Sequence, residues 1–382
     1  MCIKSLSPTI GLPYLPLRML ILLDCRPLQY AGSGSEKSRL IFSVAAALSR
    51  GSSLQWLLVA DHHCSPDFFP QLPGQTLVLP RALPGRAGWR YWYDWQIPRL
   101  AKKHKAGLVM LTGGIAAGNL PVPQILWMPE RANPKEGRSN LLLYPGRLAE
   151  SLRRAETVFC FSGRDRDWLT AREKQAADKL VVVYPTAMAT VSPLSTAERE
   201  SLKTEFARGR EYFFADVTAA GEEGVIHLLK AFSLFKKRQL SNLQLVIMGV
   251  AAEGLRQRLE TYKYREDVHW CPPAADKSGR LSAGAYAALF PFDGDSLGTP
   301  VLNAWKAGVP VIVTAGGTLQ DLAGDGALSA EAADPASLAA HLMSVYKDEA
   351  LRSRLIGEGL SRVAQFGVEP PINVIRRTIG KE

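Results

Sequence analysis

The sequence predicts an α/β protein with two doubly wound Rossmann-like domains that face a cleft. Short aliphatic runs alternate with helical patterns over residues 19–184, as expected of parallel strands covered by helices. A Pro/Thr/Ser-rich segment, Pro185–Ser195, then interrupts the pattern like an interdomain linker, and the alternation starts again after it. The length of 382 residues suits two or three domains. A composition of 47% hydrophobic and 21% charged residues excludes a disordered, collagen-like or coiled-coil chain.

The first half is expected to hold six buried strands, because each run is short and rich in β-branched or aliphatic residues. Trp92 and Trp95, in the second helical pattern, are expected on one helical face in the core, although stacking on a sugar or contact with a membrane interface stays open. The expected strands are Met19–Leu23, Trp56–Ala60, Leu108–Leu111, Gln124–Trp127, Thr157–Phe161 and Lys179–Tyr184, and the expected helices are Lys37–Ser49, Tyr91–Lys105, Tyr144–Arg153 and Arg164–Lys174.

The second half repeats this organisation. The domain boundaries expected are a leader or mis-assigned start at 1–18, a first domain at 19–187, a second domain at 188–366, and a C-terminal helix at 367–382 that packs back on the first domain. The expected strands are Tyr212–Asp216, Leu243–Met248, Val268–Trp270, Ala287–Phe290 and Pro310–Val313, and the expected helices are Thr196–Ala207, Gly224–Lys237, Glu253–Tyr264, Thr299–Ala307, Pro335–Lys347, Glu349–Gln365 and Pro370–Lys381.

Charge and cysteine content limit where the protein works. Residues 1–190 carry 24 Lys and Arg against 13 Asp and Glu, whereas residues 191–382 carry 22 against 23, so the net charge of +10 lies in the first half. This asymmetry indicates either an anionic partner or an idle basic surface. Five scattered cysteines without a CxxC pair favour a reducing cytoplasm. Residues 9–25 are too interrupted by proline and arginine for a membrane span.

Several segments, in order and at similar spacing, resemble the retaining glycosyltransferases of the family 4 type, which have the GT-B fold. The linker Leu180–Ser195 is similar to theirs, and nearly the whole chain beyond residue 19 follows their pattern. The segments are DCRPLQYAGSGSEKSRLIFSVAAAL (24–48), RRAETVFCFSGRDRDWL (153–169), YFFADVTAAGEEGVIHLLKAFSLF (212–235), FPFDGDSLGTPVLNAWKAGVPVIV (290–313) and the pattern at 326–355.

The resemblance implies a donor site in the second domain. The family places two glutamates eight positions apart around a glycine turn, and this chain has Asp295 and Asn303 there. Between them, Ser296, Leu297, Gly298 and Thr299 would offer backbone N–H groups to a diphosphate at a helix N-terminus. Where the family has an Arg and a Lys for the diphosphate, this chain has Thr218 and Glu223. Lys306 is a candidate substitute for the missing cations.

The same resemblance places an acceptor side on the first domain. The glycine loop after the first strand contains Gly32, Ser33, Gly34 and Ser35, and its amides would approach a phosphate or the donor. Ser162 occupies the position of the family's serine after the last strand. The family's histidine near the sugar is missing. The nearby Arg131 would instead meet an anionic acceptor, with a solvated loop as the alternative reading.

The function expected from the resemblance is transfer of a sugar from a nucleotide-activated donor to a glycan or lipid-linked acceptor, with retention. No cofactor, metal or nucleic acid is expected; the run His62-His63-Cys64 lacks further ligands for an ion. The basic first domain would contact an acidic membrane peripherally. The alternative is a non-catalytic GT-B scaffold, or a sugar- or nucleotide-binding partner of an active transferase, which the changes at Thr218, Glu223 and Asn303 favour.

Overall fold

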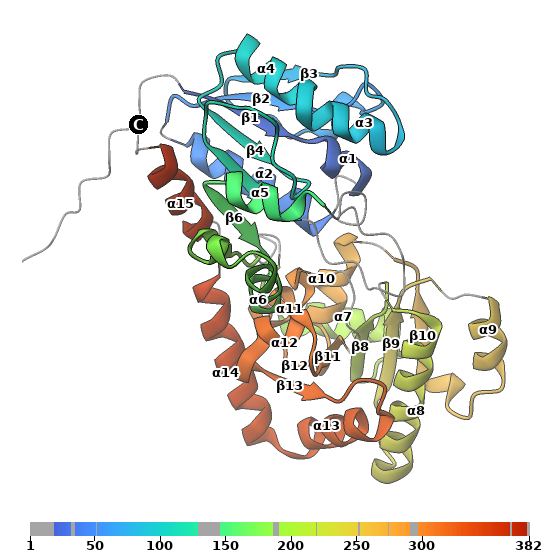
Figure 1. Cartoon of the computed structure of the whole chain (residues 1–382). Coiled ribbons are helices and arrows are strands. Elements are labelled where there is room, and N and C mark those ends of the chain that lie inside the picture. Colours follow the sequence, from blue (N-terminus) through green and yellow to red (C-terminus); the bar gives the residue numbers. More distant parts are fainter. Residues whose placement is uncertain are drawn as a thin grey trace, which may run out of the picture.

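The computed structural model describes residues 19–31, 35–50, 52–128, 146–185, 191–218, 220–250, 253–273, 275–290, 297–366 and 369–379. The described elements form two parallel sheets, each covered by helices, so that each sheet with its helices makes one domain (Figure 1). This confirms the predicted α/β fold with two Rossmann-like domains.

The first sheet has seven strands in the order β3-β2-β1-β4-β5-β6-β7, and all of its pairs are parallel. Its central strands are aliphatic runs buried on both faces, as parallel sheets between helices require. Ile21 pairs with Trp56 on one side and with Leu108 on the other. The strands are β1 (Leu20–Asp24), β2 (Gln55–Val59), β3 (Gln75–Val78), β4 (Leu108–Leu111), β5 (Gln124–Trp127), β6 (Thr157–Cys160) and β7 (Leu180–Val182).

Helices cover the first sheet, and their starts follow ordinary capping chemistry. The Ser35 hydroxyl accepts a hydrogen bond from the Ser38 N–H and so begins α2. The helices are α1 (Arg26–Ala31), α2 (Glu36–Ser49), α3 (Gly85–Tyr91), the π-helical turn η2 (Trp92–Gln96), α4 (Ile97–Lys103), α5 (Leu148–Arg154) and α6 (Gly163–Arg172), with 3-10 turns η1 (Pro66–Phe68) and η4 (Lys174–Lys179).

The second sheet has six parallel strands in the order β10-β9-β8-β11-β12-β13. Helices α8 and α13 pack against one another over one face, and α10, α11 and α14 pack together. The strands are β8 (Tyr212–Asp216), β9 (Gln244–Met248), β10 (Val268–Cys271), β11 (Ala287–Phe290), β12 (Val311–Thr314) and β13 (Ala327–Ala330). The helices are α7 (Thr196–Ala207), α8 (Glu222–Gln239), α9 (Glu253–Glu260), α10 (Ala275–Ala283), α11 (Thr299–Lys306), α12 (Thr318–Ala323), α13 (Pro335–Lys347) and α14 (Glu349–Gln365), with 3-10 turns η5 (Arg265–Asp267) and η6 (Gly324–Gly326).

The last helix, α15 (Glu369–Ile379), returns to the first domain (Figure 1). It packs against α2. Its buried face consists of Ile372, Ile375 and Ile379, at helical spacing, and all three belong to the core cluster of the first sheet. The C-terminal segment therefore contributes hydrophobic burial to a domain more than 180 residues upstream of it.

Two expectations about individual elements were wrong. The strands β3 and β13 were missed because both lie at sheet edges and neither is a continuous aliphatic run. The single helix expected at Tyr91–Lys105 is interrupted by the π-helical turn η2. The wider turn separates Trp92, which is fully buried, from Trp95, which is 70% exposed, so Trp95 is not a core residue.

Among the described residues, no helix is both long and apolar enough to cross a lipid bilayer. Four cysteines in the described part of the chain, Cys25, Cys64, Cys160 and Cys271, are buried, and none of these four forms a disulfide.

Candidate functional site

The order of each sheet reverses once, between β1 and β4 in the first domain and between β8 and β11 in the second. At such a point the connections from two adjacent strands run to opposite faces of the sheet. They leave a crevice at the carboxyl ends, which is where open α/β sheets bind ligands. Residues after β1, β4, β8 and β11 are therefore the first candidates for a site.

The N-terminus of α11 lies beyond the β11 end of the second sheet and is built on Gly298. This glycine caps the helix with φ +103°, a conformation that side chains of L-residues rarely adopt. A Cβ atom there would also lie 2.5 Å from Cδ2 of Leu322 in α12. Pro300 occupies the first turn, where its missing N–H costs nothing. The local sequence thus determines where α11 begins.

The first domain meets this helix start with a carboxylate. The backbone N–H of Thr299 donates a hydrogen bond to Oε2 of Glu36, the first residue of α2, at 3.2 Å. Leu297, just before the helix, is buried among core residues of the first domain. An anionic oxygen is favoured at a helix N-terminus by the exposed N–H groups and the helix dipole. The α11 N-terminus therefore holds an anionic group in this structure.

A second contact of the same kind runs in the opposite direction. The backbone N–H of Arg164, at the start of α6 in the first domain, donates to Oδ2 of Asp321 in α12 at 3.2 Å. Ser162, the predicted acceptor-side serine, is fully buried, and its hydroxyl accepts from the Asp165 N–H at 3.0 Å as the cap of α6. Its observed role is to start the helix that meets the second domain.

The positions that replace the family's two cations carry no positive charge. The Thr218 hydroxyl donates to Oδ1 of Asp216 at 2.7 Å, and the Ser278 hydroxyl donates to Oδ2 of the same carboxylate at 3.0 Å. Glu223 is exposed in the first turn of α8. Asp216, at the carboxyl end of β8, was not anticipated. It makes this corner of the site more acidic than the sequence alone suggested.

Two other predicted donor residues lie on α11. Asn303 is 4% exposed and faces α10, with its Nδ2 3.9 Å from where a Cβ of Gly279 would stand. Lys306 is in the last turn of the helix, seven residues from Thr299. At 1.5 Å per residue this is about 10 Å along the axis, so Lys306 sits at the other end of α11 from the amide that holds Glu36.

Part of the predicted site lies outside the described residues: Asp295, Ser296, Gly32, Ser33, Gly34 and Arg131. Among the predicted site residues that the structure describes, Leu297, Gly298 and Thr299 lie at the start of α11 and Ser35 caps α2. The Glu36–Thr299 contact brings these two groups together.

Sequence reasoning missed Glu36 and Lys37, which follow the glycine loop directly. Lys37 is buried, and its Nζ donates to the carbonyl oxygen of Thr112, just beyond β4, at 2.5 Å. The ammonium group also lies 5.9 Å from the centre of the Phe161 ring. The sequence signal that could have identified them is that both are charged and directly follow the glycine loop. The sequence does not show which parts of the fold these two side chains contact.

A buried charge cluster occupies the neighbouring strand ends of the first sheet. Asp24 closes β1, and Asp61 follows β2. Arg26 Nε lies 3.5 Å from Asp61 Oδ2, and the Tyr30 hydroxyl donates to that oxygen at 2.7 Å. Burial would raise the pKa of Asp61, but hydrogen bonds, from Tyr30 above all, and the charge of Arg26 hold it below its ordinary value.

For the Asp24 carboxylate, the effect of burial on the pKa outweighs the effect of the hydrogen bonds. Burial raises its pKa to about 6 despite hydrogen bonds from Trp92 Nε1 at 3.1 Å and the Arg26 N–H at 3.2 Å. Both bonds end on Oδ1, and Oδ2 has no hydrogen-bond partner. Asp24 is therefore a buried acid that is expected to ionise near neutral pH at a cost in stability.

We expect Asp24→Asn to make the protein more stable than the wild type above pH 6, by up to about 3 kcal/mol for a shift of about two units. Between pH 4 and 6 the folded wild type keeps a proton that the unfolded chain has released, so its free energy of unfolding falls as pH rises. The asparagine variant lacks this slope. Urea denaturation at pH 4, 6 and 8 measures it, and parallel profiles for both proteins would contradict the assignment.

Within the described residues, one group of His, Cys, Asp or Glu side chains could converge on a metal ion, namely Asp61, His62 and His63. Both oxygens of Asp61 are already in use, by Tyr30 and Arg26 and by the His63 N–H. Cys64 does not join the group; its Sγ donates to the Ser65 carbonyl. The cluster is explained by these internal contacts.

Comparisons with known proteins found similarity both to the second domain and to the fold of the whole chain. The family described as glycosyl transferases group 1 matches residues 198–362, the second domain. The O-antigen chain mannosyltransferase B of Escherichia coli is 23% identical over 227 residues, which cover 58% of this chain and 60% of that protein. The match thus spans less than two thirds of the curated relative's length.

Solved structures resemble the whole chain. HepE from Anabaena in complex with UDP-glucose has a TM-score of 0.69 at 15% identity, covering 95% of this chain and all of that one. A glycosyltransferase from Rickettsia africae has a TM-score of 0.70 at 12% identity, covering 95% and 98%. At these identities the likeness shows the fold alone. Residues 198–362 therefore resemble the group 1 glycosyl transferases, and the whole chain has the fold of these solved structures.

Proposed function

We propose that the protein transfers a sugar from a nucleotide-activated donor to a glycan or lipid-linked acceptor, with retention of anomeric configuration. The observation that carries this proposal is the Glu36 carboxylate on the Thr299 N–H, because an amide that holds a carboxylate oxygen at a helix start is suited to a phosphate or sugar oxygen. The match of residues 198–362 to group 1 glycosyl transferases supports it.

In this proposal Gly298 and Thr299 present backbone donors to the donor diphosphate, and Asp295 accepts hydrogen bonds from sugar hydroxyls. The donor would displace Glu36 from the α11 N-terminus. The buried cation next to Glu36 in the sequence is Lys37. The leaving diphosphate would be stabilised by amides and the helix dipole. No metal or cofactor is assigned. The protein would work in the cytoplasm, with its basic first domain at an acidic membrane surface.

The alternative is a GT-B protein without catalysis, which binds a sugar or nucleotide or assists an active transferase. The negative charges of Asp216, at the end of β8, and of the exposed Glu223, in the first turn of α8, favour it, because the family has two cations for the diphosphate at the positions of Thr218 and Glu223. Only the enzyme would transfer a sugar, whereas both the enzyme and the non-catalytic protein could bind the donor.

The test is a thermal-shift screen with UDP, GDP, ADP, CMP and common nucleotide-sugars at two salt concentrations. A ligand at a hundred times its Kd stabilises the native state by about 2.7 kcal/mol, so one nucleotide class is expected to raise the melting temperature by several degrees. No shift with any nucleotide would mean that the diphosphate site is closed, and the proposal would fail.

The nucleotide-sugar that gives a shift is then used in a transfer assay with Asp295→Ala. We expect this variant to lose transfer while it stays folded, whereas Asp178→Ala, a matched acidic change at an exposed position of the first domain, keeps it. If the wild type binds the donor but transfers sugar to no glycan or lipid-linked acceptor, the enzyme proposal is rejected in favour of the non-catalytic scaffold.

A further inference from the structure

One face of the first domain combines positive charge with exposed apolar side chains and takes no part in the site described above. It is formed by α3, η2, α4 and the loop after β4, and we name it the α4 face. Residues 80–128 contain seven Lys and Arg but one acidic residue, Asp94. That carboxylate is paired with Arg147 and Arg90. The exposed basic residues of this segment are Arg81, Arg86, Arg90, Arg99, Lys102, Lys103 and Lys105.

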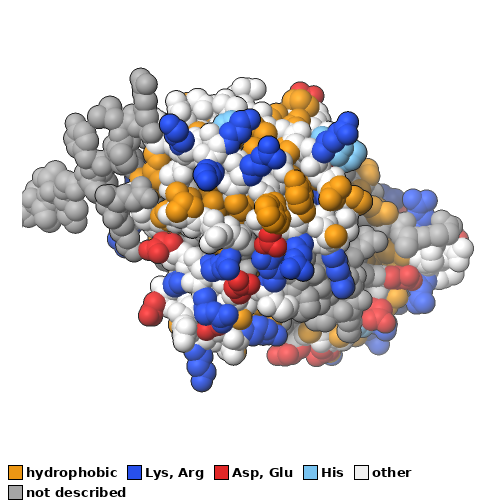
Figure 2. Space-filling view, turned by 45° about the horizontal axis from the view of Figure 1, so that its top comes forward, with side chains coloured by type: hydrophobic (Ala, Val, Ile, Leu, Met, Phe, Trp, Pro, Cys, Tyr) orange, Lys and Arg blue, Asp and Glu red, His pale blue; other side chains and the backbone are white. Residues whose placement is uncertain are grey.

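Large apolar side chains stand out beside these charges. Trp95 is 70% exposed, Leu83 is 54% exposed and Tyr91 is 39% exposed. Figure 2 shows a band of hydrophobic side chains across the first domain, with Lys and Arg beside it and few acidic groups. Contiguous exposed apolar surface edged by polar groups marks an interaction site more often than isolated residues do.

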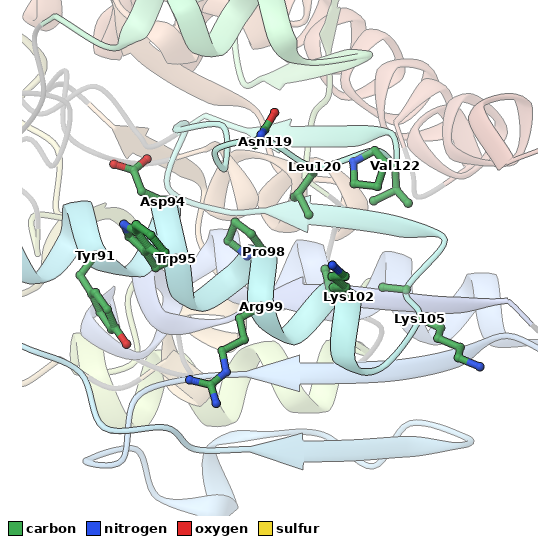
Figure 3. A pocket seen from close by; sticks show the side chains of 13 residues that line it. Tyr91, Asp94, Trp95, Pro98, Arg99, Lys102, Lys105, Asn119, Leu120 and Val122 are labelled. Atoms are coloured by element: carbon green, nitrogen blue, oxygen red, sulfur yellow. The ribbon is translucent and has the colours of Figure 1, made fainter.

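A pocket of about 740 Å³ opens within the α4 face. Tyr91, Trp95 and Pro98 line it from the helical side, and Leu120 and Val122 line it from the loop opposite (Figure 3). The basic residues that line it all come from α4 and the residues just after it: Arg99, Lys102 and Lys105. Asp94 also lines the pocket, but its carboxylate is paired with Arg147 and Arg90. The pocket therefore has apolar walls and a mainly cationic margin, which suits an amphipathic anion.

We propose that the α4 face binds the surface of an anionic phospholipid bilayer and that the pocket takes one lipid. Trp95 and Tyr91 would lie in the interfacial layer that such side chains prefer, and the lipid phosphate would contact Arg99, Lys102 and Lys105. The long stems of these basic residues reach headgroups while lying along apolar surface. Charge complementarity favours this partner, because an acidic leaflet attracts each basic residue by roughly 1 kcal/mol, or about fivefold.

A nucleic acid would use the same charges and stack on Trp95, but it has no group that fits an apolar pocket or covers Leu83. A bilayer covers both. The proposal rests on the membrane contact stated under the proposed function, and it names the residues that make this contact. Its failure would remove the membrane contact but would leave sugar transfer and donor binding, which use other residues, untouched.

The experiment is flotation of the full chain with vesicles of phosphatidylcholine, with and without 30% phosphatidylglycerol, at physiological salt. We expect binding only to the anionic vesicles. The triple variant Arg99→Gln/Lys102→Gln/Lys105→Gln is expected to lose about a hundredfold in partitioning. Trp95→Ser is expected to lose about tenfold. The matched control is Lys230→Gln/Lys237→Gln/Lys263→Gln, which removes the same charge from a second basic pocket on the other domain.

Equal losses in the two triple variants would mean that total charge, and not the α4 face, governs binding, and would overturn the proposal. Equal partitioning into both kinds of vesicle would overturn its electrostatic part. A salt-sensitive affinity for single-stranded RNA that the α4 triple variant loses, with no vesicle binding by the wild type, would assign the face to nucleic acid instead. Unchanged melting temperatures and nucleotide-induced shifts in the variants verify that the chain is folded.

Discussion

Gly298→Ala is expected to lower the free energy of unfolding by roughly 2–5 kcal/mol and to abolish the nucleotide-induced thermal shift. Two costs add. The backbone at φ +103° would strain a residue with a side chain, and the new methyl group would stand 2.5 Å from Cδ2 of Leu322 in α12. Either way of relieving the clash moves the start of α11, and with it the Thr299 N–H that is proposed to hold the donor.

Gly316→Ala separates these two costs. Gly316 also has a positive φ, +76°, but a Cβ there would meet nothing within 4 Å. This control should therefore lose only the conformational part, about 1–2 kcal/mol, and should keep the nucleotide shift. Urea denaturation of both variants measures the difference. Equal losses would mean that the Leu322 contact carries no cost. A double-mutant cycle with Leu322→Ala then shows whether the two sites are coupled.

The fold could be predicted because its central strands are buried on both faces. Runs such as Leu108–Leu111 and Ala287–Phe290 leave no other explanation for so many consecutive apolar residues. The edge strands Gln75–Val78 and Ala327–Ala330 contact one neighbouring strand each and include polar or small residues. They are less buried than the central strands and therefore lack the continuous apolar run that identifies a strand in the sequence. Trp95 shows a third limit: the π-helical turn that exposes it changes the helical period within five residues.

The site could be predicted only where it is local in the sequence. The turn at Gly298 and Pro300 is defined by its own residues, and it is found as expected at a helix start. The Glu36–Thr299 contact joins residues 263 positions apart, and the sequence carries no mark of it. The bond from the Thr218 hydroxyl to Asp216 spans only two residues, but the sequence does not show that the Ser278 hydroxyl, 62 positions from Asp216, donates to the same carboxylate. Predicting the Glu36–Thr299 contact requires the packing of the two domains.

The buried cluster at the edge of the first sheet leads to the second large effect. Arg26→Ala is expected to cost about 3–5 kcal/mol, because removing one partner of a buried ion pair leaves the other charge uncompensated. Arg26 is 2% exposed, and its guanidinium lies over the Trp89 ring at 3.9 Å and the Trp92 ring at 4.8 Å. Its Nη2 donates to the Leu83 carbonyl at 3.0 Å. The substitution therefore removes packing and hydrogen bonding as well as charge.

The matched control is Arg90→Ala, which removes an arginine whose side chain is 78% exposed and which faces Asp94 on the same helix at 3.6 Å. A solvent-exposed pair of this kind is worth at most about 1 kcal/mol. The loss caused by Arg26→Ala should also shrink as pH is lowered toward 5, because Asp61 and Asp24 can then take up protons in place of the missing cation. Urea denaturation at pH 5 and pH 8 measures both effects. A loss no larger than that of Arg90→Ala, or one independent of pH, would mean that water reaches the cluster and screens its charges, and the argument for Asp24 as a costly buried acid would fall with it.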